Sequence, residues 1–76
     1  MNKQTFMKAL VNEGFATQWE AENHSIYAGE DGWLYYNPVT KHQAAVKSAN
    51  SLVLYQYRAD VDEYWSRLVT LNLVGV

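Results

Sequence analysis

The chain has 76 residues, with six basic and eight acidic side chains, a formal net charge of −2 and no cysteine. Disulfides and thiolate metal sites are therefore excluded, and the mildly acidic balance argues against non-specific binding to duplex nucleic acid, which needs a basic surface. The six Tyr, three Trp and two Phe residues carry more aromatic surface than one core of this size can bury.

The first residues predict a short amphipathic helix over residues 3–13. Asn2 is a suitable N-cap, and Gly14 can end the helix in the left-handed conformation. Phe6 and Leu10 fall on one stripe at helical spacing, which gives the helix an apolar side.

From residue 15 onward the pattern predicts strands at 15–20, 25–28, 33–36, 42–46 and 52–58. The turn signals at 29–32 (two glycines) and 37–40 (Asn-Pro) separate neighbouring strands of an antiparallel meander. The two alanines within 42–46 also suit a helix, so both readings of that segment stay open.

The last part of the chain predicts a second helix over residues 61–71. Asp60 and Glu63 have the spacing of a capping box, and Tyr64, Trp65 and Leu68 follow at helical intervals. Residues 1–76 are therefore expected to form one α+β domain. It has an N-terminal helix, an antiparallel meander sheet of four to five strands and a C-terminal helix, with the helices on one sheet face.

Two short helices cannot cover both faces of such a sheet, so we expect an aromatic face that binds a partner. Its register stays open: a hairpin loop of even length at 29–32 separates Tyr27 from Trp33 and Tyr35, whereas an odd length puts the three on one face. The predicted partner-binding residues are an aromatic group (Tyr27, Trp33, Tyr35 and Tyr57) and an acidic rim (Glu20, Glu22, Glu30 and Asp31).

No motif for catalysis, metal binding or cofactor binding is present. His24 and His42 would lie two strand spacings apart, about 9–10 Å, which is too far for a shared metal ion. No serine has the context of a nucleophile elbow, and no glycine-rich loop precedes a helix to hold a phosphate. We therefore expect no enzymatic activity, no metal and no cofactor.

These observations predict a protein-protein interaction module whose partner is another protein or a second copy of itself. In being small, acidic, cysteine-free and without motifs, the chain is similar in composition to the inhibitors that phages and mobile elements encode, including anti-CRISPR proteins. That likeness implies a host defence or nucleic-acid-processing protein as partner. The alternatives are a single-stranded nucleic-acid platform, against which the acidic balance counts, and a small structural or regulatory subunit that docks through the tail at 71–76.

We expect no contact with a membrane. The N-terminal apolar stretch is too short and too polar for a signal peptide, and the apolar tail at 68–76 is far below the ~20 residues that span a bilayer. The expected location is the cytoplasm.

Overall fold

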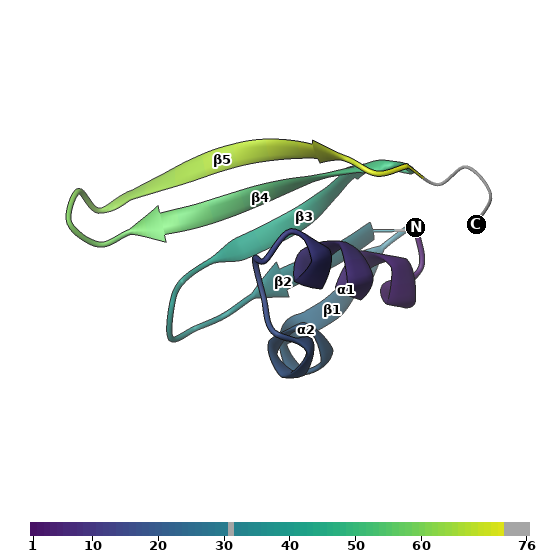
Figure 1. The fold of residues 1–76 in the computed structure, drawn as a ribbon, viewed down its shortest axis with the longest axis horizontal. Helices are drawn as coiled ribbons and strands as arrows, with labels where there is room; N and C mark the ends of the chain where they lie inside the picture. The colour runs from purple at the N-terminus through teal and green to yellow at the C-terminus, as the bar shows by residue number, and fades with distance from the viewer. Residues whose placement is uncertain (31, 73–76) are drawn as a thin grey trace.

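The computed structural model describes residues 1–30 and 32–72, and Figure 1 shows two helices beside one antiparallel sheet. The molecule is elongated, with extents of 41 × 23 × 22 Å. The elements are α1 (Lys3–Asn12), α2 (Gln18–His24), β1 (Ser25–Gly29), β2 (Gly32–Tyr36), β3 (Gln43–Ser48), β4 (Ser51–Arg58) and β5 (Glu63–Thr70). Each strand pairs antiparallel with the next in the order β1-β2-β3-β4-β5. The α+β class and the five-stranded meander are thus confirmed, and residues 42–46 are strand.

The helix predicted over residues 61–71 is wrong, because this segment forms β5 and both helices precede the sheet. Its pairing with β4 runs without interruption from Arg58 opposite Glu63 to Ser51 opposite Thr70. Asp62 closes the hairpin with a left-handed backbone (φ 49°). The segment is rich in the strand-forming residues Tyr, Trp, Val and Thr, and the free edge of β4 offers it backbone hydrogen bonds. Together these favour a strand over the helix that the spacing predicts.

The strand predicted over residues 15–20 is also wrong, because residues 18–24 form α2. Thr17 is its N-cap, and the Thr17 hydroxyl accepts from the backbone N–H of Glu20 (3.2 Å). The Glu20 carboxylate accepts from the backbone N–H of Thr17 (2.7 Å), which completes a capping box. This exchange satisfies two N–H groups that a helix start would otherwise leave unpaired.

The first helix is confirmed. The Asn2 side chain accepts from the backbone N–H of Thr5 (2.8 Å), and Gly14 turns the chain with φ +68° after the helix ends. That left-handed turn favours glycine. Within residues 1–30 and 32–72, neither helix has the length or apolar character needed to cross a membrane.

A one-residue bulge sets the register of the first hairpin. Gly29 lies opposite Gly32, but Tyr27 lies opposite Trp33, so Ala28 has no partner residue on β2. An extra residue on one strand moves all preceding side chains to the other face. Tyr27 therefore shares a face with Trp33 and Tyr35, and of the two registers left open by the sequence this is the one that the structure adopts.

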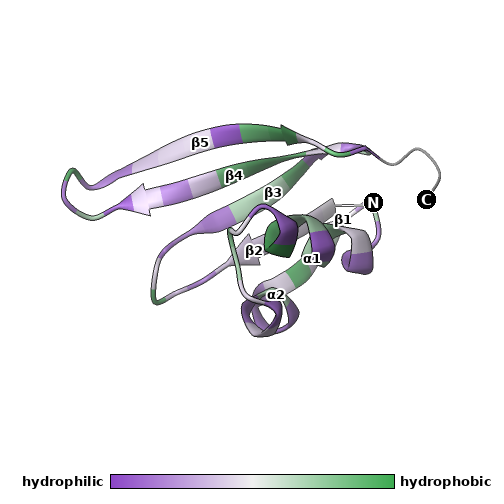
Figure 2. Cartoon of the chain, in the orientation of Figure 1, coloured by the Kyte–Doolittle hydropathy of each residue, from purple (hydrophilic) through white to green (hydrophobic). Residues whose placement is uncertain are grey.

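The core lies between the helices and one face of the sheet. Its buried apolar residues are Phe6, Ala9, Leu10, Ala16, Ala21, Tyr35, Ala44, Leu52, Leu54 and Val69, which form a single cluster. Members from α1, α2 and four strands pack together, so both helices cover the same face. The predicted arrangement on one face was for a different pair of helices, of which the C-terminal one is absent. Figure 2 shows apolar stretches also on the strands furthest from the helices, including the C-terminal part of β5. The β4–β5 hairpin extends beyond the helical layer (Figure 1).

Candidate functional site

Tyr35 lies in the core and is not available to a partner, which corrects its predicted role. Its side chain is 1% exposed. The ring meets that of Phe15 edge to face, with 5.8 Å between centroids. Burial raises the pKa of its hydroxyl, and a hydrogen bond with Asn37 partly offsets this rise. Tyr35 holds the helices on the sheet and does not form part of a binding surface.

Trp33 and Tyr27 lie on the same helix-covered face as Tyr35, toward its β1 edge. The half-buried Trp33 donates its indole N–H to the carbonyl of Met1 (3.1 Å). Tyr27 is 58% exposed and meets the Trp33 ring edge to face, with 5.3 Å between centroids. Tyr27 is thus the member of this trio that offers the most surface to a partner.

Tyr57 lies on the opposite face, so the four predicted aromatic residues do not form one patch. Its ring pairs with that of Tyr64, with 5.1 Å between centroids, and the Lys41 ammonium lies 4.9 Å from its centre. Its hydroxyl donates to the Asp62 carboxylate, and this hydrogen bond is the main reason that the pKa of Tyr57 is raised.

The predicted acidic rim is not assembled around an aromatic face. Glu20 serves the start of α2, and its second carboxylate oxygen accepts from the Asn37 side chain (3.1 Å). The backbone hydrogen bond from Thr17 is the largest of the effects that lower the pKa of Glu20. Glu22 accepts from the Gln18 side chain on the same helix (2.8 Å). Glu30 is exposed in the first hairpin turn, and Asp31 lies outside the described residues.

The sheet face that points away from the helices, called here the open face, carries an apolar row across all five strands. Consecutive members of the row lie directly opposite one another in the strand pairings: Ile26, Leu34, Ala45, Val53 and Leu68. Four strand spacings separate the ends of the row, which makes it about 19 Å long. Ile26 and Leu68 at the two ends are 59% and 54% exposed.

A second row on the open face is polar and rich in tyrosine. It consists of Tyr36, Gln43, Tyr55 and Ser66, again in opposite positions, and the Tyr57–Tyr64 pair continues it toward the β4–β5 turn. Tyr36 is 42% exposed and Tyr64 is 45% exposed. No residue of the two rows is charged. The sequence reasoning missed these rows as a site, although the odd-length register already grouped Ile26 with Leu34 and Tyr36.

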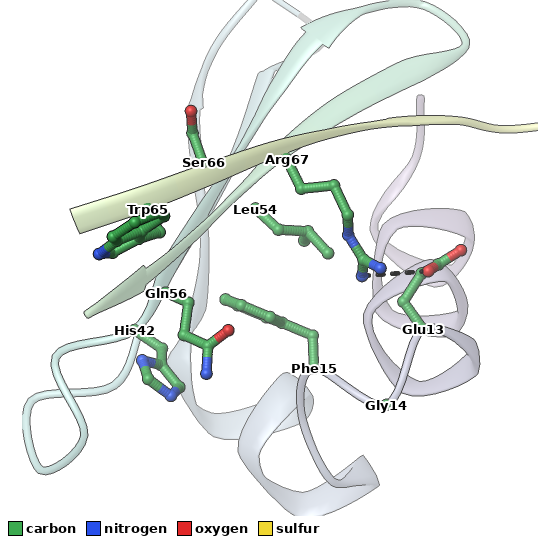
Figure 3. Close-up of a pocket in the computed structure, with 9 residues that line it drawn as sticks. All are labelled: Glu13, Gly14, Phe15, His42, Leu54, Gln56, Trp65, Ser66 and Arg67. Carbon is green, nitrogen blue, oxygen red and sulfur yellow. Dashed lines mark hydrogen bonds and ion pairs between the residues drawn. The ribbon is translucent and has the colours of Figure 1, made fainter. Parts of the chain in front are cut away.

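A cleft of about 340 Å³ lies on the other side, where the β4–β5 hairpin overhangs the loop between the helices (Figure 3). Its walls include Phe15, His42, Gln56, Trp65 and Arg67. His42 Nδ1 accepts from the backbone N–H of Tyr57 (3.0 Å), so the neutral ring carries its proton on Nε2. The Phe15 ring lies 5.6 Å from the imidazole.

The cleft does not bring a nucleophile and a base together. Among the described residues that line it, Glu13 is the one carboxylate, and it pairs with Arg67 (3.2 Å). Figure 3 shows the Ser66 hydroxyl pointing away from the cleft. Within the described ranges 1–30 and 32–72, no group of three or more His, Asp or Glu side chains could hold a metal ion.

The open face therefore carries an apolar row that crosses all five strands, and the cleft is a separate surface of mixed polarity. The two lie on opposite sides of the β4–β5 hairpin. No protein-family model, no curated protein and no solved structure matches the chain.

Proposed function

We propose that the chain is a non-enzymatic protein-binding module whose open face packs against an apolar surface of a partner protein. The observation that carries the proposal is a pair of uncharged rows, an aliphatic one that crosses all five strands and one rich in tyrosine that crosses β2 to β5. The cores of protein interfaces are depleted of charged residues and enriched in tyrosine. A sheet face that only met water would carry charged or small polar residues in these positions.

The arrangement of the two rows indicates what the partner surface offers. The aliphatic row needs an apolar strip about 19 Å long. The tyrosine row beside it supplies hydroxyl groups that can donate to, or accept from, polar groups at the border of that strip. An acidic rim does not contribute to this surface, because Glu20 and Glu22 make their contacts on α2.

The likeness in composition to small phage-encoded inhibitors supplies a setting for this proposal, in which the module covers a surface that a host protein needs. Two of the three cations that the nucleic-acid alternative needs already have partners, since Arg58 pairs with Asp60 (2.7 Å) and Lys41 lies over the Tyr57 ring. Lys47, which lies beside Tyr55, is then the one left to contact a phosphate, and a track of phosphates needs several cations.

The test is a pair of matched substitutions that replace an exposed aliphatic residue by lysine. Ile26→Lys puts a charge at one end of the apolar row, whereas Val39→Lys puts the same charge in a turn where the side chain is 90% exposed. Neither change opens a cavity in the core, so both variants should fold. The tagged proteins are used to capture partners from a native extract, and the captured protein is then titrated against each purified variant.

We expect Ile26→Lys to weaken binding of the captured protein by at least about tenfold, and Val39→Lys to leave it within about twofold, because a buried unpaired charge costs far more than an exposed one. Equal affinities for the two variants would show that the open face is not the binding surface. Binding that disappears at high salt and depends on nucleic acid would favour the platform alternative.

A further inference from the structure

The outer edge of β5 lacks three of the features that protect the edge of a sheet, namely short length, a bulge and proline; its two charged residues are Glu63 at the start of the strand and Arg67, which pairs with Glu13. Within residues 1–30 and 32–72, β5 pairs with β4 on one side and with no strand on the other. It keeps one uninterrupted register over eight residues, and all of them except Val69 are exposed. It contains no proline, glycine or lysine. A long, regular edge of this kind is a template for a further strand.

The opposite edge differs in length and in regularity. β1 has five residues, follows directly after α2, and is interrupted by the bulge at Ala28. Short length and a bulge are two of the devices that prevent edge-to-edge pairing. The contrast between the two edges therefore points to β5 as the pairing edge.

We propose that β5 pairs antiparallel with β5 of a second copy of this chain, about a two-fold axis that passes through the two Ser66 residues. This proposal concerns the sheet edge and does not depend on what binds the open face. A homodimer of this type is a closed and symmetric assembly, and two edges of one kind satisfy each other's backbone N–H and C=O groups.

Symmetry leaves three registers to compare. A two-fold axis normal to the sheet keeps every side chain on its own face, so the axis must pass through a pair of identical residues near the middle of β5. An axis at Arg67 places two guanidinium groups opposite each other. An axis at Trp65 sets the end of β5 against the turn around Asp62, where the chain has left the strand (φ 49°). An axis at Ser66 pairs residues 63–69 with themselves.

The Ser66 register also matches side chains on both faces. On the open face it places Tyr64 opposite Leu68 of the second copy, and these two side chains are 45% and 54% exposed. On the other face it places the 53% exposed Trp65 opposite Arg67 of the second copy. The Arg67 side chain is 61% exposed despite its ion pair with Glu13, and the Trp65 ring already holds one guanidinium, that of Arg58, at 5.4 Å from its centroid, so the ring suits a cation.

The helices do not obstruct this assembly. In Figure 1 both helices lie toward the β1 side, and β5 forms the opposite border of the molecule. The dimer would have a ten-stranded sheet with the two open faces on one side and the two helical layers on the other. The apolar row of each copy, which ends at Leu68, would then be continued across the shared edge by the Tyr57–Tyr64 pair of the other copy.

The first measurement is the mass of the unmodified chain by sedimentation equilibrium. We expect a species of twice the 8.7 kDa chain mass at a protein concentration of about 200 µM, with dissociation on dilution. A protein that stays monomeric at every concentration up to about 200 µM would overturn the proposal.

The second measurement uses charge reversal at the axis. Ser66→Asp and Ser66→Lys each place two like charges opposite one another, and each should weaken the homodimer by at least about tenfold, whereas a mixture of the two variants should form a heterodimer. The control is Ala28→Asp, which puts the same charge at an exposed site on the β1 edge. A dimer that survives Ser66→Asp, or that Ala28→Asp disrupts equally, would overturn the assignment to β5.

The third measurement fixes the register, and the absence of cysteine makes it direct. Opposite residues of an antiparallel pair have Cα atoms about 4.5–5.5 Å apart, which lies within the range that a disulfide can bridge. Oxidation of Ser66→Cys should therefore give a covalent dimer, and oxidation of Ala28→Cys should not. Cross-linking of Trp65→Cys but not of Ser66→Cys would overturn the Ser66 register.

Discussion

Replacing Tyr35 by alanine should remove a large part of the stability of the fold. The side chain is 1% exposed, and a buried aromatic residue of this type covers about 150–250 Å², equivalent to about 4–6 kcal/mol of transfer free energy. Truncation of buried aromatic residues to alanine costs about 3–5 kcal/mol. A domain of 76 residues has a total unfolding free energy of roughly 4–11 kcal/mol. Tyr35→Ala should therefore leave the protein marginally folded or unfolded.

Two further variants keep the measurement quantitative if Tyr35→Ala does not fold. Tyr35→Phe keeps the ring and loses the hydrogen bond with Asn37, which should cost about 1 kcal/mol. Tyr27→Ala removes an aromatic side chain from the same sheet face where it is 58% exposed, and should cost about 1 kcal/mol through its lost contact with Trp33.

The assay is guanidinium denaturation followed by far-ultraviolet circular dichroism. We expect the midpoint of Tyr35→Ala to fall by more than about 1 M relative to that of Tyr27→Ala. The reasoning is refuted if the unfolding free energies of the two alanine variants differ by less than about 0.5 kcal/mol, a difference that is typical of exposed sites. Tyr35 would then not hold the helices on the sheet, and its assignment to the core would be wrong.

Three other substitutions probe local features. The pKa of Glu20 is lowered below its ordinary value of 4.5, chiefly by the backbone hydrogen bond from Thr17. The ionised carboxylate therefore contributes to the stability of the fold above that value, and this stability is lost as the pH falls through the folded-state pKa. Glu20→Gln keeps an acceptor for the cap, and denaturation between pH 7 and pH 3 should show a shallower loss of stability for this variant; an identical slope would contradict the assignment. Trp33→Phe removes the donor to the Met1 carbonyl and should cost about 1 kcal/mol by urea denaturation, beyond the effect of ring size. Gly29→Ala forces a side chain onto φ +123° and should cost about 1–3 kcal/mol although the site is spacious; an unchanged melting temperature would show that the turn relaxes.

The middle of the fold could be predicted from the sequence because its signals are local. Glycine at 29 and 32 and the Asn-Pro pair at 37–38 mark the ends of strands, and the segments between them are rich in strand-forming residues. All four strands between residues 25 and 58 were placed within two residues of their observed ends. The first helix was predictable for the same reason, since Asn2 and Gly14 mark its limits.

The two errors of secondary structure have different origins. A signal for α2 is present, because Thr17 and Glu20 have capping-box spacing, but the alternation from residue 15 is equally typical of a strand. β5 could not be recognised from spacing alone. This edge strand has apolar residues on both faces, so Tyr64, Trp65 and Leu68 fall at intervals that also suit a helix. The choice between strand and helix depends on the free edge of β4, with which the segment pairs.

The exposed aromatic surface was predictable in kind but not in membership. Composition correctly indicated more aromatic surface than the core can hold, since Tyr27, Tyr36, Tyr64 and Trp65 remain substantially exposed. Which side chains face the helices depends on the unpaired Ala28 in β1. A single bulged residue leaves the alternating pattern unchanged on either side of it, so the pattern fits both registers equally well.

The order of elements along the chain has a kinetic consequence. Each strand after β1 pairs with the strand that precedes it, so each hairpin can close over a short loop as soon as its second strand is available. The apolar side of α1, in contrast, lies in one buried cluster with Leu52 and Leu54 of β4 and Val69 of β5, which lie far along the chain. Although α1 comes first in the sequence, its packing against the core should therefore be completed last. Leu10→Ala would then accelerate unfolding and leave the folding rate nearly unchanged, whereas a folding rate that fell in proportion to stability would place the helix in the nucleus.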